Sequence, residues 1–506
     1  MPPANSLRLD HPSINRRQRW IVTAIAVCTA LVGVAAAMHY AGAGLALAHY
    51  DARAHVVVAR RILDSLMPGW QQIGAVWLPL PHVLNMLPVQ IDAWYRSGAS
   101  AIAISIASMA IGAGALAAVI LRHTGSITGA AVTPALLMIN PNVLYLQSTP
   151  MTEPLLFGTT LLAVALTVNW IDSGAPPQAA APGLAVAAAC MTRYEAWPIS
   201  AALLVLAAAV LVHRGAAPRA AIAAVARVAA YPAVAVLLFL LNSRWTVGSW
   251  FVSSGFFVPE NEALGQAGLA WRQVGEGLDR LSGPVTLWVA YAGGAMICWT
   301  AARSRARAPL VLVLALAAAA ALPWYAFYAG HPFRVRYSAP LIVASAAIAG
   351  IAVSLLPRWS RLAAAAAIVA ATAVQASPLD RGAPLIAESQ RDAANQAGRR
   401  AVTAYLVAHH DGTPIMMSMG SLAHYMHDLA ANGFAIRDFL HEGNGDVWKA
   451  AVKTGPRPYV SWVAIEEAAE GGDELFARTR ADAKFLDGFV RVAEGGGVAL
   501  YRATPR

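Results

Sequence analysis

Long apolar runs, separated by short polar segments, occupy most of the first three quarters of the chain. The first run begins at Trp20 and continues to about His39. Most runs approach twenty residues, the length at which a helix crosses the ~30 Å hydrocarbon core of a bilayer. The run at 180–192 is shorter, so a tilted or re-entrant segment around Arg193 remains open. The pattern predicts about eleven transmembrane helices, the later ones at residues 99–121, 126–147, 152–171, 180–192, 197–213, 220–241, 284–302, 309–328, 337–356 and 361–377.

Residues 40–98 are too polar to form a second span, and they predict a large first loop. His49 to His55 opens this loop, and polar positions at helical spacing over residues 54–66 predict an interfacial amphipathic helix. Tryptophans and prolines follow, a composition typical of a segment that lies at the level of the lipid headgroups. These residues are Trp70, Trp77, Pro79, Pro81, Pro88 and Trp94.

The positions of the arginines predict the orientation of the chain. The polar stretch before Trp20 is basic, which indicates a cytoplasmic N-terminus, and the apolar run after it is long enough for a retained anchor. Counting spans from that start places the arginine-rich short loops in the cytoplasm, at Arg122, Arg214, Arg219, Arg303, Arg305, Arg307, Arg358 and Arg361. We therefore expect a protein of the cytoplasmic (inner) membrane whose first loop faces the extracytoplasmic side.

The composition changes near Ser377. Acidic residues become more frequent there, and the lysines of the chain occur only after this point. Helices are predicted at 384–409 and 421–431, strands at 414–419 and 459–465, and a hairpin at 490–502 around Gly495-Gly496-Gly497. We therefore expect two domains: a transmembrane domain over residues 1–377, and a small, soluble, extracytoplasmic α/β domain over residues 378–506.

Composition narrows the function classes. Of the 506 residues, 58% are hydrophobic and 13% are charged, which excludes a small soluble binding module. All 23 basic residues before residue 378 are arginines, and their number alone is no sign of a nucleic-acid partner, so we predict none. Cys28, Cys190 and Cys298 lie in or beside apolar runs, so no disulfide framework is expected in the tail.

The polar residues at the predicted extracytoplasmic rim suit one reaction in particular. Glycosyl transfer from a lipid-linked sugar phosphate needs a carboxylate that accepts the proton of the acceptor, and cations that hold the departing phosphate. Asp51 is the candidate general base. Arginine binds phosphate oxygens through a planar, permanently charged guanidinium, and it provides three of the candidate substrate-binding residues. These are Arg193, Arg334 and Arg336, with Glu153, Glu195, His331 and Tyr337 beside them.

An aspartate in the first external loop, together with this topology, resembles the GT-C superfamily of polyprenyl-phosphate-dependent glycosyltransferases, in particular the protein mannosyltransferase and aminoarabinose transferase branch. Three phrases are similar to bacterial members: Asn140-Pro141-Asn142, Thr149-Pro150-Met151-Thr152-Glu153-Pro154 and Thr192-Arg193-Tyr194-Glu195-Ala196-Trp197. The resemblance covers residues 20–377. It implies inverting transfer, at the bilayer surface, from a polyprenyl-phosphate sugar to a glycan, lipid or protein acceptor.

The sequence departs from that superfamily at one position. Asp51 is followed by Ala52, whereas many members carry two acidic residues in this loop. A divalent cation would therefore have to recruit Glu153 or Glu195. We therefore predict no cofactor, and the sequence leaves dependence on a divalent metal ion open.

Structural interpretations of the same residues remain open. Asp51 could cap a helix that starts near Arg53, Arg193 could simply pair with Glu195, and Arg334 and Arg336 could anchor lipid headgroups. Three other functions also remain: a transporter or flippase, an oligosaccharide polymerase or ligase, and a non-catalytic assembly protein. A carrier would be expected to show polar residues at the membrane midplane, and a polymerase or ligase a large later external loop.

Overall fold

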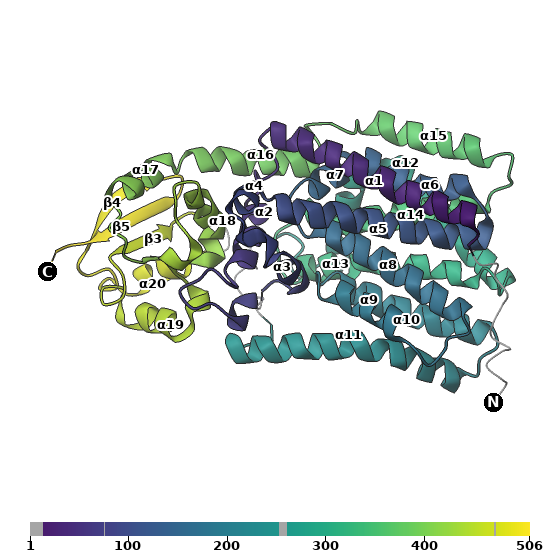
Figure 1. Cartoon of the computed structure of the whole chain (residues 1–506), viewed down its shortest axis with the longest axis horizontal. Coiled ribbons are helices and arrows are strands. Elements are labelled where there is room, and N and C mark those ends of the chain that lie inside the picture. The colour runs from purple at the N-terminus through teal and green to yellow at the C-terminus, as the bar shows by residue number, and fades with distance from the viewer. Residues whose placement is uncertain (1–13, 75, 252–260, 470–471, 506) are drawn as a thin grey trace.

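The computed structural model describes residues 14–74, 76–251, 261–469 and 472–505. It contains a long bundle of helices and a smaller α/β unit that lies at one end of the bundle, as Figure 1 shows. Helix α1 (Arg16–Gly42) begins at the opposite end and runs toward the α/β unit.

The bundle confirms a polytopic helical membrane protein. Among the described residues, eight helical segments are long and apolar enough to cross a membrane, and a bent pair makes nine if it counts as one span. Two shorter apolar helices, α9 (Ala180–Cys190) and α15 (Arg361–Gln375), complete a set that coincides with the eleven predicted runs. Besides α1, the long segments are α5 (Ala99–Thr124), α8 (Glu153–Asp172), α10 (Ala196–His213), α11 (Pro218–Thr246), α12 (Ala267–Arg303), η4 with α13 (Ala308–Ala320 and Ala321–Tyr328), and η5 with α14 (Val335–Ser338 and Ala339–Leu355).

The bent pair consists of α6 (Ile127–Ile139) and α7 (Pro141–Gln147), which meet at an angle of 78°. Asn140 stands at the bend, and its side-chain oxygen accepts hydrogen bonds from the backbone N–H groups of Asn142 and Val143. Proline at the first position of α7 suits this start because it needs no hydrogen-bond acceptor there. The phrase Asn140-Pro141-Asn142 therefore ends one helix and begins another.

Small residues allow the central helices to approach closely. A Cβ added to Gly112 of α5 would lie 2.8 Å from the Cα of Gly158 in α8. A Cβ on Gly129 of α6 would likewise lie 2.4 Å from the Cβ of Ser354, in α14. Because lipid tails are as apolar as the helices, such close packing is a main source of helix association in membranes. The segment formed by η5 and α14, Val335–Leu355, is the most enclosed of the described spans, with 94% of its most apolar stretch buried.

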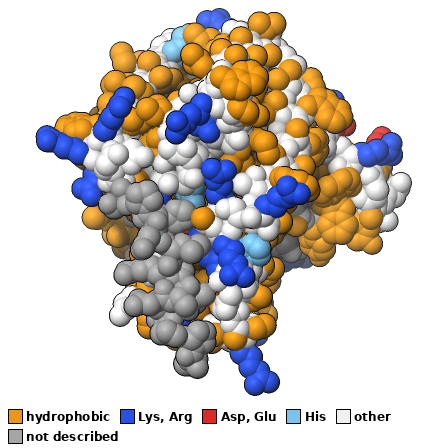
Figure 2. All heavy atoms as spheres, turned by 90° about the vertical axis from the view of Figure 1, so that its right-hand side faces the viewer, with side chains coloured by type: hydrophobic (Ala, Val, Ile, Leu, Met, Phe, Trp, Pro, Cys, Tyr) orange, Lys and Arg blue, Asp and Glu red, His pale blue; other side chains and the backbone are white. Residues whose placement is uncertain are grey.

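The helix ends remote from the α/β unit carry the arginines of the short loops. Figure 2 shows several Lys and Arg side chains on this face. One buried group, the Asp172 cluster, ties these ends together: Asp172 accepts hydrogen bonds from Arg214 at 2.8 Å and pairs with His123 at 2.9 Å. Arg214 also donates to the carbonyl of Arg305 at 3.0 Å. The arginines predicted to share one side of the membrane therefore do share one end of the bundle.

The first loop differs from the prediction in two ways. Its main helix, α2 (Tyr50–Arg60), begins before Arg53, and His49 caps it in place of Asp51. The helix is also buried along almost its whole length, so it does not lie exposed at the interface. The sequence pattern could not show this, because the faces of α2 are covered by segments distant in the chain. Short elements follow α2: η2 (Trp70–Ile73), α3 (Leu80–Asn85), η3 (Pro88–Gln90) and α4 (Asp92–Ser97).

The α/β unit has a five-stranded sheet in the order β2-β1-β3-β5-β4. Strand β1 pairs in parallel with β2 and β3, whereas β5 pairs antiparallel with β3 and β4. The predicted hairpin is present, and Gly496 and Gly497 adopt the positive φ angles that its tight turn requires. The elements are α16 (Pro384–Ala397), α17 (Arg400–His409), β1 (Ile415–Met417), α18 (Met419–Ala430), η6 (Ile436–Asp438), β2 (Phe439–Leu440), η7 (Glu442–Asn444), α19 (Gly445–Thr454), β3 (Trp462–Glu466), α20 (Glu474–Ala481), β4 (Phe489–Gly495) and β5 (Val498–Ala503).

The α/β unit and the first loop share one hydrophobic core. Val56 and Val57 of α2 belong to the same buried cluster as Leu422 of α18 and Trp462 of β3. Helix α16, in contrast, packs toward the bundle, since Leu385 and Ile386 belong to the main cluster of the membrane helices. Asn142 fixes this helix by accepting a hydrogen bond from the backbone N–H of Leu385 at 3.1 Å. Helix α2 is therefore enclosed between the bundle and the tail.

Candidate active site

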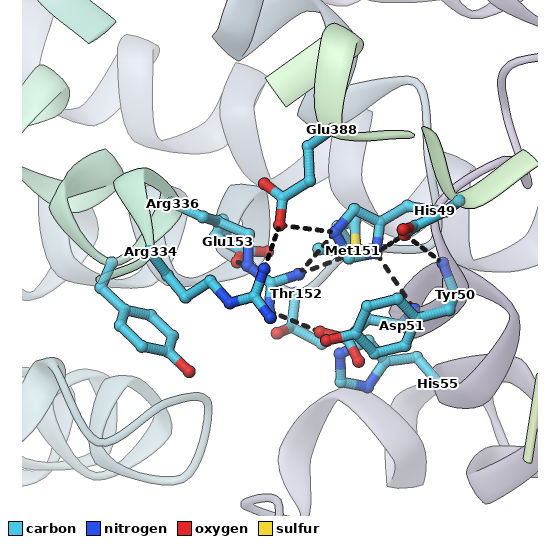
Figure 3. A network of polar contacts seen from close by, with 12 residues as sticks. His49, Tyr50, Asp51, His55, Met151, Thr152, Glu153, Arg334, Arg336 and Glu388 are labelled. Atoms are coloured by element: carbon cyan, nitrogen blue, oxygen red, sulfur yellow. Dashed lines mark hydrogen bonds and ion pairs between the residues drawn. The ribbon is translucent and has the colours of Figure 1, made fainter. Parts of the chain in front are cut away.

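Asp51 lies in the first turn of α2, where the bundle meets the α/β unit. The cap of this helix is His49, whose Nδ1 accepts a hydrogen bond from the backbone N–H of Asp51 at 3.1 Å. The carboxylate of Asp51 accepts a hydrogen bond from Arg336 at 2.5 Å. Arg336 lies in η5, 285 residues later in the chain, and Figure 3 shows the two side chains meeting within a dense polar network.

Two opposing effects set the pKa of Asp51. Burial raises it, but the positive charge of Arg336, assisted by His49 and His55, lowers it, and the pKa falls well below its usual range. Asp51 is therefore ionised at neutral pH. A carboxylate in this state can accept a proton, although its strong ion pair with Arg336 makes it a weak base.

A chain of alternating charges continues from Arg336. Its Nε lies 3.6 Å from the carboxylate of Glu153, and Arg193 lies 3.2 Å from the same oxygen. Arg193 also pairs with Glu195 at 2.8 Å and donates to the hydroxyl of Thr152 at 3.0 Å. We call Asp51, Arg336, Glu153, Arg193 and Glu195 the Asp51 cluster. The phrases around Thr152 and Arg193 that the sequence singled out are thus adjacent in space.

Glu153 is fully buried, at 0% exposure, yet neither of its carboxylate oxygens has hydrogen-bond geometry with a described partner. It is held by the charges of two arginines instead. A buried carboxylate without hydrogen bonds is costly, so Glu153 calls for an explanation other than stability.

The tail contributes two carboxylates that the sequence reasoning missed. Glu388 of α16 lies 3.7 Å from Arg334 and 3.8 Å from His49, and Figure 3 shows it at the edge of the network. Asp392, one turn later on α16, accepts a hydrogen bond from the backbone N–H of Tyr50 at 3.1 Å. The sequence predicts that this helix belongs to a separate soluble domain, and nothing in its own composition indicates that it reaches the first loop.

Charge acts differently on these two carboxyl groups. Burial raises the pKa of Glu388, but the contact with His49 and the charges of Arg336 and Arg334 lower it below its usual value. Burial raises the pKa of Asp392, and in this case it prevails. Glu388 is therefore the more firmly ionised of the two.

The predicted residues His331 and Tyr337 pair with each other. The Tyr337 hydroxyl lies 3.1 Å from Nε2 of His331, while Nδ1 of His331 lies 3.0 Å from the carbonyl of Pro332. This pair lies in the same short segment, residues 331–337, as Arg334 and Arg336. None of the described hydrogen bonds or ion pairs joins it directly to Asp51.

Sequence reasoning also missed a pair of buried histidines, His55 and His82, near Asp51. His55 follows Asp51 by one helical turn, and its Nδ1 lies 3.1 Å from Nε2 of His82 in α3. Both imidazoles are buried, and burial lowers the pKa of His55 to about 3 and that of His82 well below its ordinary value. A small pocket lined partly by Asn85, Ser105 and Thr152 adjoins the pair.

No group of three or more His, Cys, Asp or Glu side chains among the described residues is arranged to hold a metal ion. The carboxylates that a metal would have to recruit, Glu153 and Glu195, are already bridged by Arg193.

Comparison with protein-family models and with curated protein sequences gives no match. Solved structures do match, and among them are two of ArnT from Cupriavidus metallidurans. The ArnT structure bound to undecaprenyl phosphate has a TM-score of 0.55 and 13% sequence identity, and the alignment covers 94% of this chain and 99% of that one. The apo ArnT structure has a TM-score of 0.57 and 14% identity, with the same coverage. The predicted resemblance is thus confirmed at the level of the fold: over almost its whole length, this chain has the fold of ArnT.

Proposed function

We propose that the protein is an integral membrane glycosyltransferase that moves a sugar from a polyprenyl-phosphate donor to an acceptor outside the cytoplasm. The observation that carries this proposal is the contact between Asp51 and Arg336, which sets a candidate proton acceptor beside a candidate phosphate-binding cation. The shared fold supports it, because one matching ArnT structure is bound to undecaprenyl phosphate.

The proposed reaction requires one proton transfer and one displacement. Asp51 accepts the proton of the acceptor hydroxyl or amine as that atom attacks the anomeric carbon of the donor sugar. The bond between this carbon and the phosphate oxygen breaks, and its electron pair remains on the polyprenyl phosphate. Arg336 and Arg334 stabilise the charge on the phosphate, and attack from the opposite face inverts the anomeric configuration.

Because Asp51 pairs with Arg336, binding of the polyprenyl-phosphate donor would also activate Asp51 as a base. Arg336 holds the pKa of Asp51 low only while its charge is directed at that carboxylate. A phosphate that shares Arg336 would weaken the pair, and the pKa of Asp51 would rise toward its ordinary value. Asp51 would then become a better base when the donor is bound.

Transfer can be tested directly. The purified protein in nanodiscs is incubated with radiolabelled polyprenyl-phosphate sugars and a membrane extract, and label on the acceptor is measured. We expect transfer by the wild type and almost none by Asp51→Asn. Equal transfer by a folded Asp51→Asn variant would remove Asp51 from the mechanism, and absence of transfer with every donor would favour a transporter or an assembly protein.

The proposal includes a sidedness, with the N-terminus in the cytoplasm and residues 378–506 outside it. Single cysteines at exposed positions of a cysteine-free variant can report this, one at Arg305 and one at Lys449. An impermeant thiol reagent applied to intact cells should label the second and spare the first. The reverse pattern would place the Asp51 cluster in the cytoplasm.

A further inference from the structure

His49 combines two roles that constrain its protonation. Its Nδ1 accepts the hydrogen bond that caps α2, so the lone pair of this nitrogen is in use and the proton of the neutral ring is on Nε2. Among the residues that the structure describes, the other close partner of Nδ1 is Asp392, at 3.7 Å, which is beyond hydrogen-bond distance. The cap therefore fixes His49 as a donor at Nε2.

That donor faces a second donor. Nε2 of His49 lies 3.2 Å from a terminal nitrogen of Arg336, which can only donate. Among the described residues, the other contact of this arginine nitrogen is the sulfur of Met151 at 4.0 Å, a weak acceptor. Two N–H groups separated by this distance can both donate to a single oxygen at about 2.9 Å from each nitrogen.

A carboxylate already stands beside these donors. One oxygen of Glu388 lies 3.8 Å from Nε2 of His49 and 3.7 Å from Arg334. Both distances are too long for hydrogen bonds, so Glu388 balances the charge without satisfying the donors. Its side chain retains 15% exposure, whereas that of His49 retains 3%. Figure 3 shows Glu388 at the side of the network toward α16, between Arg334 and His49.

We propose that His49, Arg336 and Arg334 form an anion subsite for a phosphate oxygen of a polyprenyl phosphate, and that Glu388 of the tail occupies its entrance until the phosphate displaces it. The inference rests on the function proposed above, and it adds an imidazole donor and a competing carboxylate to that site. A lipid phosphate is favoured over free phosphate because Arg336 lies in the first turn of the apolar segment Val335–Leu355, which is long enough to cross a membrane.

The two residues should have opposite effects on affinity. His49→Asn keeps a side chain that caps helices well but removes the Nε2 donor. It should weaken binding of undecaprenyl phosphate about 10-fold to 100-fold, the range for a lost hydrogen bond to a charged group. Glu388→Gln removes the competing charge and should tighten binding roughly twofold to fivefold, as expected for a partly exposed ion pair.

The measurement is equilibrium binding of undecaprenyl phosphate to the full chain in nanodiscs, with thermal unfolding as a check of the fold. His441→Asn is the matched control, because His441 also caps a helix through Nδ1, at Gly443 in the α/β unit, away from this subsite. It should bind the lipid as the wild type does.

The outcomes separate the two proposals. Weaker binding by both His49→Asn and Glu388→Gln would show that Glu388 does not compete with the phosphate. Unchanged binding by His49→Asn would remove His49 from the subsite. Either result overturns this inference and leaves the proposed function standing. A wild type that binds no undecaprenyl phosphate would overturn the proposed function as well. Inorganic phosphate that competes at equal concentration would assign the subsite to free phosphate and overturn the lipid assignment.

Discussion

Among the described residues, the Asp172 cluster and the Asp51 cluster, which adjoins His49, lie at opposite ends of the bundle, and they differ in how their carboxylates are hydrogen-bonded. In the Asp172 cluster, Asp172 uses one oxygen for Arg214 and the other for His123. Arg214 also donates to the carbonyls of Ile171, Arg305 and Ala306. In the Asp51 cluster, Glu153 lacks hydrogen bonds, and at its edge the donor of His49, which is not a member, faces a donor of Arg336.

The difference teaches how to separate a structural cluster from a functional one of the same composition. A polar network whose acceptors and donors are matched stabilises one arrangement of the helices that it joins. A network that keeps unmatched donors and acceptors carries an energetic cost, which a ligand with complementary groups can remove. Both oxygens of Asp172 are engaged, so this carboxylate fits the first description, whereas Glu153 and the facing donors of His49 and Arg336 fit the second. Four predictions test this contrast.

Loss of the Asp51 carboxylate should have the largest effect on catalysis. Asp51→Asn keeps the size of the side chain but cannot accept the proton, so the transfer rate should fall about 10²-fold to 10⁴-fold. Thermal unfolding should change little, because Arg336 retains Glu153 as a counter-ion. Rates and melting temperatures of the purified variant measure both effects. A large loss of stability with normal turnover would make Asp51 structural.

The equivalent substitution in the Asp172 cluster, at the other end of the bundle, should lower stability and leave the transfer rate almost unchanged. Asp172→Asn leaves Arg214 buried without its carboxylate, and breaking a buried ion pair costs about 3–5 kcal/mol. The melting temperature should therefore fall strongly, while the transfer rate per folded molecule stays within about twofold of the wild type. A variant of normal stability whose turnover is lost would contradict the contrast between the clusters.

The tail should influence catalysis through α2. Arg53, two residues after Asp51, is buried and donates to both oxygens of Asp428 in α18, at 2.7 and 2.8 Å. Asp428→Asn weakens this contact, which holds the helix that carries Asp51, and turnover should fall roughly tenfold with a smaller change in donor affinity.

Asp446→Asn is the control for this effect, since it alters an exposed ion pair with Lys449 in the same α/β unit. Its transfer rate should equal that of the wild type. Equal rates for Asp428→Asn and Asp446→Asn would separate the tail from the function of α2.

Acidification should destabilise the protein through His55. Burial lowers the pKa of this residue in the folded state to about 3, against 6.5 ordinarily. Between these pH values the unfolded chain binds more protons than the folded chain, so stability rises with pH and is lost on acidification. Lowering the pH from 7 to 5.5 should remove about 1 kcal/mol through His55 alone.

His55→Asn removes that titration, so its melting temperature should fall less than that of the wild type over the same pH range. His409→Asn, at an exposed position of α17, should retain the wild-type dependence. A pH dependence that is identical in His55→Asn and the wild type would show that the imidazole does not stay neutral in the folded state.

Much of the fold could be predicted from sequence because it depends on local properties. The apolar runs are long enough to span a bilayer, and this length requirement places each helix without reference to the others. The arginines between runs predict which helix ends lie together, and the contact of Arg214 with Arg305 agrees with that grouping. The hairpin at Gly496 and Gly497 was equally local.

The candidate site was predictable only in part. Asp51, Glu153, Arg193 and Arg336 were recognised because charged residues at the ends of apolar runs are conspicuous. Their order in space was not, since the partner of Asp51 lies 285 residues away. His49 was overlooked as a donor because its role depends on which of its nitrogens caps α2. That property exists only once the helix has formed.

The sequence by itself determined the membrane-spanning architecture and the gathering of these polar residues at one end of the bundle, because both follow from the cost of placing polar groups in hydrocarbon. Tertiary structure alone decided which charges pair, which donors remain unmatched and that α16 brings Glu388 to the site. It also enclosed α2, whose amphipathic pattern suits a lipid surface as well as a protein core. The physical reason is that pairing energies depend on distance and burial, and these are set by packing between segments remote in the chain.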